Sequence, residues 1–84
     1  MYYIYILKSR SDSKFYTGFT ASLKKRLIEH QKGNVDSTKN RRPLDIIYYE
    51  AYKEKSDALS REKFLKTTKG KVQLRKQIPN SSLV

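Results

Sequence analysis

The first apolar run of the chain is short and rich in residues that favour strands. Residues 2–7 read Tyr-Tyr-Ile-Tyr-Ile-Leu, a polar stretch follows at residues 8–13, and a second short run begins at Phe15–Gly18. Aromatic and β-branched side chains fit the pleated surface of a sheet, and a Ser/Asp/Lys cluster after them is typical of a turn. The pattern predicts an antiparallel hairpin. A turn at the middle of the polar stretch would place Tyr5 opposite Tyr16.

A helical pattern follows the hairpin. Leu23 and Leu27 are four residues apart and lead to His30, which is the spacing of one face of a helix. A threonine or serine in residues 20–22 can cap this helix, and Gly33 can close it. The pattern predicts a first helix packed on the hairpin.

The remaining elements are one strand and two helices. Residues 34–42 show no apolar period and are predicted to be a loop, whereas residues 44–52 are rich in Ile and Tyr and are predicted to be the third strand. Helical patterns follow at residues 56–66 and 68–77. We expect residues 79–84 to be a flexible C-terminal tail.

The order β-β-α-β-α-α predicts an α+β fold in which a three-stranded antiparallel sheet is flanked by helices. The chain of 84 residues suffices for one domain and one core, which we place at residues 1–78. Without cysteine, neither a disulfide framework nor a thiolate metal site can stabilise it. The longest apolar run is far short of the ~20 residues of a membrane span. We expect a cytoplasmic protein that does not enter a membrane, and a monomer over an oligomer.

The chain is strongly basic. Nineteen Lys and Arg against eight Asp and Glu give a formal net charge of +11. Such self-repulsion is usually tolerated where an anionic partner offsets it, and nucleic acid fits that role. The alternatives are solvated faces that keep the protein soluble, a ribosome-associated protein or a membrane-surface protein. The basic residues gather at Lys24 to Arg26, at Lys39 to Arg42, and in residues 63–84, which carry six basic side chains and no acidic one.

Glu62 is the most informative single residue. In the helix predicted at residues 56–66 it shares a stripe with Ala58 and Leu65, where an apolar side chain is expected. A partly buried carboxylate without a partner costs several kcal/mol, so Glu62 should pair with a Lys, an Arg or a metal ion. A simple salt bridge and a metal site both satisfy this requirement.

Four other residues are candidates for chemistry. Tyr5 and Tyr16 are two of seven tyrosines, and a phenol near cations can accept a proton, contact nucleic acid or simply pack in the core. Arg26 and His30 lie four residues apart, hence on one face of the predicted helix. Arg26 can bind a phosphate, and His30 can transfer a proton near neutral pH. The other strand tyrosines are assigned to packing, with one of them able to stack on a base.

The residue inventory limits the cofactor. There is no phosphate-binding glycine loop, no cysteine and no second histidine, and few acids are present for a two-metal site. A single hard cation is favoured, and Mg²⁺ is commonly held by one or two carboxylates together with substrate phosphates.

These residues also match a known pattern. Tyr3-Ile4-Tyr5 followed by Tyr16-Thr17-Gly18 resembles the paired tripeptides of the GIY-YIG nuclease superfamily. Arg26 lies ten and His30 fourteen residues after Tyr16, and Glu62 lies on a later helix, as in that family. The resemblance covers nearly the whole chain and is strongest to the small stand-alone bacterial members, which also share motifs similar to residues 39–43 and 60–63.

The resemblance implies a divalent-metal-dependent endonuclease that cleaves DNA phosphodiester bonds, structure-selective or weakly sequence-specific, in DNA repair or recombination. It implies that Glu62 ligates Mg²⁺ or Mn²⁺, that Arg26 stabilises charge on the scissile phosphate, and that Tyr5, Tyr16 and His30 complete the site. Gly18 would allow close approach of the phosphate to the backbone. Tyr3 replaces the first motif glycine, Phe19 replaces a basic residue of some relatives, and the asparagine that several relatives carry after the glutamate has no clear counterpart.

The alternative is a non-catalytic basic module that binds DNA or RNA on the same fold. In both cases the nucleic-acid partner, DNA more than RNA, is expected to meet the basic residues. The predicted contacts are Gly18, Lys24, Lys25, Lys39, Arg41, Arg42, Lys63, Lys66, Lys69 and Lys71.

Overall fold

The computed structural model describes residues 1–82 and has the predicted α+β architecture. Its elements in chain order are β1 (Tyr2–Ser9), β2 (Phe15–Thr20), α1 (Leu23–Lys32), a 3₁₀ turn (Lys39–Arg41), β3 (Leu44–Tyr52), α2 (Lys55–Leu65), α3 (Thr68–Gln77) and α4 (Pro79–Ser82). The order β-β-α-β-α-α is confirmed. None of these helices is long and apolar enough to cross a bilayer.

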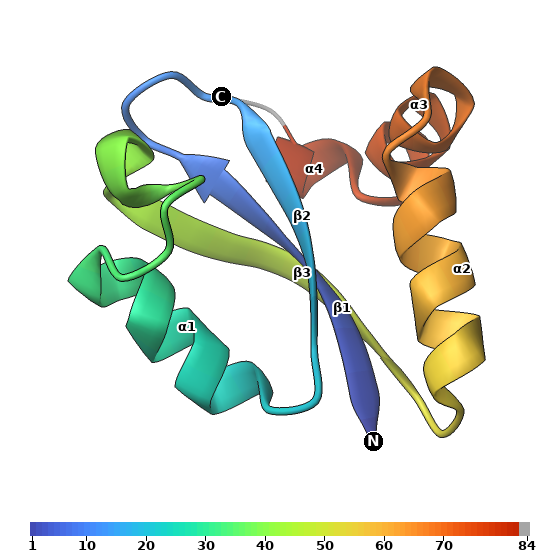
Figure 1. Ribbon diagram of the computed structural model, residues 1–84. Helices are drawn as coiled ribbons and strands as arrows, with labels where there is room; N and C mark the ends of the chain where they lie inside the picture. The colour runs from blue at the N-terminus through green and yellow to red at the C-terminus, as the bar shows by residue number, and fades with distance from the viewer. Residues whose placement is uncertain (83–84) are drawn as a thin grey trace.

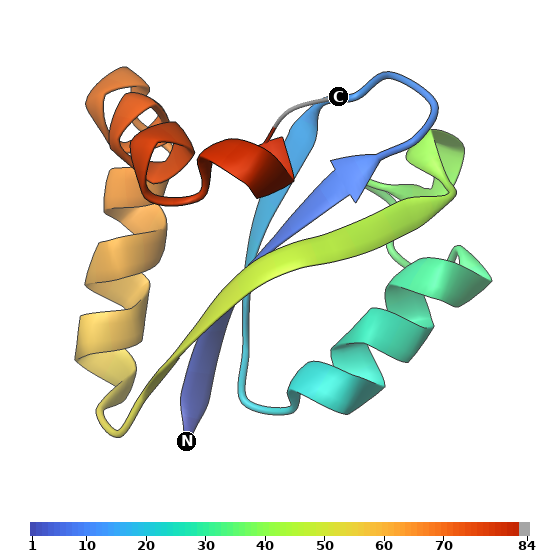
Figure 2. The ribbon, with the colours of Figure 1, turned by 180° about the vertical axis from the view of Figure 1, so that it is seen from behind.

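The sheet is antiparallel with strand order β2-β1-β3, so β1 is central and both neighbours are edge strands. Helix α1 covers one face, and α2 with α3 covers the other (Figure 1, and from behind in Figure 2). Because β1 has a helix layer on each side, its apolar residues need not alternate with polar ones. This explains the unbroken run at residues 2–7.

The alternation of side chains along β1 divides the core in two. Ile4 and Ile6 point to the α2 and α3 side, where they pack with Leu65 among others. Tyr5 and Leu7 point to the α1 side. The larger part of the core therefore lies under α2 and α3, and Tyr5 lies fully buried under α1.

The hairpin register differs from the predicted one. Tyr5 lies opposite Gly18, and Tyr16 lies opposite Leu7. The turn is centred further along the chain because β1 extends through Ser9, which pairs with Leu44 of β3. Tyr5 and Tyr16 are consequently diagonal neighbours on one face, with ring centroids 6.3 Å apart, and do not face each other directly.

The C-terminal segment also differs from the prediction. Helix α3 ends at Gln77, as predicted, but the expected flexible tail begins with the helical turn α4, which contacts β3. Proline is favoured at the first position of a helix, because its fixed φ suits the helix and its missing N–H is not needed there. Residues 83–84 lie outside the described part of the chain.

Candidate functional site

Helix α1 brings Arg26 and His30 to the tyrosines of the hairpin. It begins after Ser22, whose amide donates to Thr20 Oγ1 at 3.0 Å, and it ends at Gly33, which has the left-handed φ of 79°. Its apolar residues Leu23 and Leu27 pack toward the sheet. Arg26 and His30 lie beside that apolar stripe, on the flank that faces β2.

A hydrogen-bonded chain runs inward from the tyrosine motif. The Tyr5 hydroxyl lies 2.7 Å from His30 Nε2, and His30 Nδ1 lies 2.8 Å from Thr38 Oγ1. Tyr5, His30 and Thr38 are each at most 1% exposed. This chain fastens α1 and the loop at residues 34–42 to the central strand.

Arg26 acts on the Tyr5 hydroxyl as a hydrogen-bond donor and as a positive charge. A guanidinium can only donate, so the Tyr5 oxygen is its acceptor. Because a phenol oxygen has one proton and two lone pairs, the direction of the bond between Tyr5 and His30 Nε2 depends on the tautomer of the ring. In either tautomer both ring nitrogens of His30 are hydrogen-bonded, one to Tyr5 and one to Thr38.

Burial keeps this inner chain uncharged beyond Arg26. Desolvation, opposed by the hydrogen bond from Arg26, raises the pKa of the Tyr5 phenol to about 12. Desolvation, followed by the Arg26 charge, lowers the pKa of His30 below its ordinary 6.5. Tyr5 and His30 are therefore neutral at pH 7, and neither is open to solvent. The structure favours them as supports of Arg26.

Tyr16 and Arg26 form the outer layer of the site. The Tyr16 ring is half-buried and lies 5.2 Å from the His30 ring, edge to face. The Arg26 side chain is 35% exposed, and its Nη1 lies 3.7 Å from the Glu29 carboxylate. Both side chains are partly exposed, and they are near enough to each other for the charge of Arg26 to act on the Tyr16 phenol.

Glu62 approaches from the other layer, on α2, which packs against β1 and β2. Its side chain is 20% exposed, which agrees with the partial burial predicted from the stripe of Ala58 and Leu65. Its carboxylate lies 3.4 Å from Lys66 Nζ, so one of the pairings expected for Glu62, a salt bridge to a lysine, is present. Its charge also acts on the Tyr5 phenol, although more weakly than Arg26 and Tyr16 do.

The residues around Glu62 suit at most a lightly held cation. Within residues 1–82, no three His, Asp or Glu side chains gather to hold a metal ion. One accessible carboxylate is nevertheless what Mg²⁺ needs from a protein when phosphate oxygens and water supply its other ligands. Glu62 fits this role, with Lys66 as the counter-ion that the metal would replace.

The structure explains the glycine at position 18 in a way that the sequence did not suggest. It is buried opposite Tyr5, and a Cβ there would collide with the Tyr5 ring and hydroxyl. The glycine makes room for the Tyr5 phenol to reach Arg26 and His30. The expected contact with phosphate remains a prediction.

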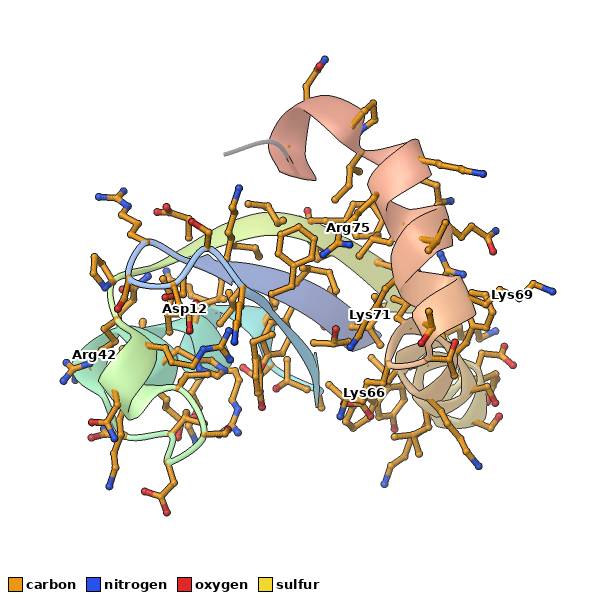
Figure 3. All side chains as sticks on the ribbon, turned by 90° about the horizontal axis from the view of Figure 1, so that it is seen from above. Asp12, Arg42, Lys66, Lys69, Lys71 and Arg75 are labelled. Atoms are coloured by element: carbon orange, nitrogen blue, oxygen red, sulfur yellow. The ribbon has the colours of Figure 1, made fainter. Side chains whose placement is uncertain are left out.

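The basic residues of α2 and α3 do not all point the same way. Lys63, Lys66, Lys69 and Lys71 are exposed. Figure 3 shows Lys66 and Lys71 on the side toward the sheet, together with Arg75, whereas Lys69 points away from it. The Arg75 guanidinium lies 5.5 Å from the centre of the Phe15 ring. Arg75 was not among the predicted contacts, although its four-residue spacing from Lys71 is a signal that could have found it.

The basic residues of the 34–42 loop have structural contacts of their own. Arg41 bonds to Asp12 at 3.3 Å, and Ser9 Oγ donates to the Arg41 carbonyl at 2.6 Å. Arg42 donates to the Lys39 carbonyl at 3.0 Å. Arg41 and Arg42 thus fix the loop that carries Thr38. Their contact with nucleic acid, and that of Lys39, remain predictions.

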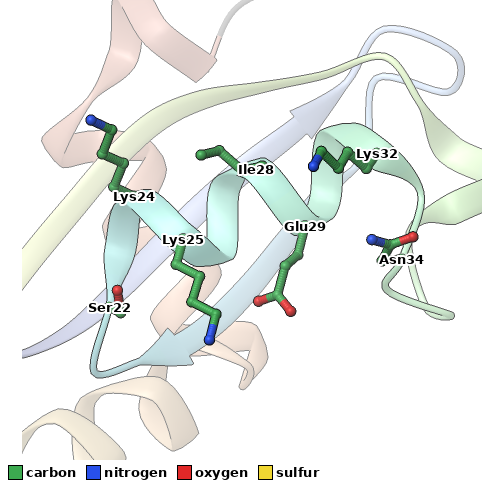
Figure 4. A pocket seen from close by; sticks show the side chains of 7 residues that line it. All are labelled: Ser22, Lys24, Lys25, Ile28, Glu29, Lys32 and Asn34. Atoms are coloured by element: carbon green, nitrogen blue, oxygen red, sulfur yellow. The ribbon is translucent and has the colours of Figure 1, made fainter.

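On α1, Lys24 and Lys25 are exposed, as expected of nucleic-acid contacts. They border a shallow hollow of about 440 Å³ on the outer surface of the helix, together with Lys32 and the exposed Ile28 (Figure 4). Glu29 contributes the carboxylate of this surface. Positive charge therefore dominates the outer surface of α1.

Two further positions make contacts that the sequence did not suggest. Thr38, the last member of the inner chain, was assigned to a featureless loop. Phe19 stacks on Tyr2, with ring centroids 6.2 Å apart and an interplanar angle of 8°, so it packs in the sheet where some relatives carry a basic residue.

Comparison with known proteins agrees with this geometry. Residues 1–76 match the family model described as the GIY-YIG catalytic domain. A UPF0213 protein of Staphylococcus saprophyticus is 43% identical over 67 residues, covering 79% of this chain and 80% of the relative. A UPF0213 protein of Clostridium perfringens is 40% identical over 77 residues, covering 88% and 82%. The solution NMR structure of a UPF0213 protein from Bacillus halodurans is 30% identical, with a TM-score of 0.59, covering 92% of this chain and 85% of that one.

Proposed function

The chain belongs to the GIY-YIG family, and from this premise we propose that it is a divalent-metal-dependent endonuclease that hydrolyses phosphodiester bonds in DNA. The observation that carries the proposal is the pairing of Arg26 with an outer phenol, Tyr16, over a buried support formed by Tyr5 and His30. Such a site offers a cation and a polarisable hydroxyl to one phosphate. Nucleic acid is the substrate class that the net charge of +11 also favours.

The roles of the residues follow from their exposure. Arg26 binds a non-bridging oxygen of the scissile phosphate and stabilises the charge that builds there. Tyr16, the partly exposed phenol of the pair, orients the attacking water and, in its phenolate form, accepts the proton of that water. Tyr5 and His30 hold Arg26 in place.

Glu62 is the residue that would hold Mg²⁺ or Mn²⁺ at this site. When bound, the cation supplies Lewis-acid stabilisation of the phosphate and lowers the pKa of nearby groups. Glu62 binds it from α2, and Lys66 remains close by to meet the substrate backbone.

The substrate is proposed to be recognised by structure more than by sequence. Arg26 and the nearby lysines suit phosphates, and contacts to phosphates carry no sequence information directly. Branched or damaged DNA, as met in repair or recombination, fits such a site. We propose a cytoplasmic location because the sequence contains no long apolar run.

A second candidate function is a binding module without efficient chemistry. Two observations favour it: the Glu62 carboxylate is already paired with Lys66, and the described residues add no further acid to a metal site. Such a module would use the same basic residues on DNA or RNA.

One experiment separates the two candidates. The pure protein is incubated with labelled single-stranded, duplex and branched DNA, with Mg²⁺, Mn²⁺ or chelator. We expect cleavage that requires metal and that Glu62→Ala abolishes, while DNA affinity measured in chelator changes less than twofold. Asp57→Ala, which removes an exposed carboxylate from the first turn of the same helix, is the matched control and should keep full cleavage.

Salt-sensitive binding without cleavage by the wild type under every metal condition would favour the binding module. Full cleavage by Glu62→Ala would refute the role of this carboxylate.

A further inference from the structure

Two tyrosines lie side by side on the opposite flank of α1 from Arg26. Tyr49 is the β3 partner of Tyr5 and Tyr3 is two residues earlier on β1, so both side chains are on the α1 face of the sheet. Their ring centroids are 6.3 Å apart with an interplanar angle of 60°. This flank of α1 faces β3, because the Gln31 side chain of α1 donates to the Leu44 carbonyl of β3 at 2.7 Å. The pair is therefore separate from the site around Tyr16.

Packing does not account for this pair. Tyr49 is 56% exposed, although it is a large aromatic residue of a strand. The hydroxyls of Tyr48 and Tyr52 donate to Glu50, and that of Tyr5 is hydrogen-bonded to His30 Nε2. Within the described residues, the structure gives no hydrogen bond to the hydroxyls of Tyr3 and Tyr49. Their rings are thus held at the surface without a polar partner.

A hollow of about 530 Å³ opens beside the pair. Tyr3 and Tyr49 line one side of it, Leu23 and Leu27 of α1 line another, and Lys24 stands at its rim. Apolar walls with one cation at the edge suit a planar, uncharged ring attached to an anionic backbone. An acidic ligand without a planar ring would make no contact with these apolar walls.

We propose that Tyr3 and Tyr49 form a stacking site for an unpaired base of a nucleic-acid strand, with Lys24 meeting the adjacent phosphate. The inference rests on the proposed function and names its substrate class, a nucleic acid with a single-stranded segment. The charge of α1 favours this occupant, since Lys24, Lys25 and Lys32 outnumber Glu29 along its exposed surface. Stacking on aromatic rings accepts any base, so it adds affinity without sequence preference. A paired base inside a duplex is not available to it.

The test compares affinities in chelator, where no cleavage occurs. Single-stranded DNA, single-stranded RNA and the fully paired duplex of one sequence are titrated with the full chain, and binding is followed by fluorescence anisotropy. Tyr49→Ala should weaken single-strand binding by roughly 5- to 100-fold, and duplex binding by less than twofold. Ile46→Ala, a change of another exposed apolar residue on β3, should alter neither, and Tyr49→Phe should keep full affinity.

A measurement on the wild type makes the test independent of any variant. A 2-aminopurine in the single strand should lose fluorescence on binding, since stacking on tyrosine quenches it, and Lys24→Ala should weaken the binding. The DNA and RNA arms identify the natural strand. Equal losses of single-strand and duplex affinity in Tyr49→Ala would overturn the proposal. So would self-association of the wild type that Tyr49→Ala abolishes, because the face would then bind a second copy.

The two proposals fail separately. If the wild type shows the base-stacking signal but never cleaves with metal, the nuclease proposal fails and the stacking site stands. If cleavage depends on Glu62 but Tyr49→Ala binds single strands as well as the wild type does, the stacking site fails alone.

Discussion

Gly18 lies directly against the Tyr5 phenol across the hairpin, and a Cβ at Gly18 would stand 2.8 Å from Tyr5 Cε1 and closer still to the hydroxyl. We predict that Gly18→Ala displaces Tyr5, destabilises the fold by about 1–3 kcal/mol, and lowers cleavage because Arg26 loses its support. Urea unfolding and cleavage rate measure the two effects. Thr17→Ala on the same strand, whose side chain faces the other layer, is the control. Unchanged stability and cleavage in Gly18→Ala would contradict this prediction, because the hairpin would then accommodate the Cβ without displacing Tyr5.

The two motif tyrosines should respond differently to loss of the hydroxyl. Tyr16→Phe removes the hydroxyl of the partly exposed tyrosine and is expected to lower the cleavage rate by about 10²- to 10⁴-fold, with little change in stability. Tyr5→Phe removes the hydrogen-bond partner of the buried His30 Nε2, so it should cost about 1–3 kcal/mol of stability. Single-turnover cleavage at saturating protein, paired with urea unfolding, separates these outcomes. The reverse pattern would make Tyr5 the residue that meets the water.

The pH dependence of stability should carry a contribution from His30. Its folded-state pKa lies below the ordinary 6.5, because burial and then Arg26 disfavour the imidazolium. The unfolded chain therefore binds a proton more readily below pH 6.5, and the contribution of His30 is complete above that pH and is lost as the pH falls. The free energy of unfolding of the wild type should approach that of His30→Gln between pH 7.5 and 5.5.

His30 is the single histidine, so its ring signals in an NMR titration report this group alone. We expect a midpoint below 6.5. A midpoint at or above 6.5 would contradict the neutral chain of hydrogen bonds from Tyr5 to Thr38.

The strands and helices were predictable because local pattern decides them. The run at residues 2–7 and the Leu23 and Leu27 spacing each have one good structural solution, and the structure confirms both. The partial burial of Glu62 was predictable for the same reason, since the residues four before and three after it are apolar. Local sequence thus gave the layers and placed each candidate on its element.

Contacts between elements were not predictable in the same way. The hairpin register depends on how far β1 pairs with β3, and the hydrophobic pattern of the hairpin alone does not contain that information. Thr38 joins His30 only because the 34–42 loop folds back on α1, fixed by Arg41 and Arg42. The roles that we propose for Tyr5 and Tyr16 differ because Tyr5 is buried and Tyr16 is partly exposed, and burial depends on the whole fold.

A second polar cluster, on the α2 face of the sheet, should determine how firmly α2 is held. The Glu50 carboxylate accepts from the hydroxyls of Tyr48 and Tyr52 and from Arg61 Nε and Nη2 at 3.0 and 3.1 Å. The side chains of Arg61 and Glu50 are only 20% and 17% exposed. Arg61 Nη2 also donates to Gln77 of α3 at 3.2 Å. The cluster therefore joins β3, α2 and α3 through one carboxylate.

Burial disfavours ionised Glu50, but the hydrogen bonds from Arg61 and the two tyrosines outweigh it, so the pKa of Glu50 is lowered from its ordinary value of 4.5. The stability it contributes is present above that pH and is lost as the pH falls through the lowered value. At pH 7, Glu50→Ala leaves the partly buried Arg61 charge without its carboxylate partner. This should lower the free energy of unfolding by about 2–4 kcal/mol. Because Arg61 precedes Glu62, the same change should also lower cleavage by loosening α2.

The double variant Glu50→Leu with Arg61→Leu tests whether the charge pair itself is needed. Replacing a buried ion pair by apolar residues of similar size is often neutral or stabilising, whereas breaking it is costly. We expect the double variant to regain most of the stability that Glu50→Ala loses, as measured by urea unfolding, and cleavage to recover with it. If stability returns but cleavage does not, a firmly held α2 is not enough for cleavage. Arg61 would then act on the site directly.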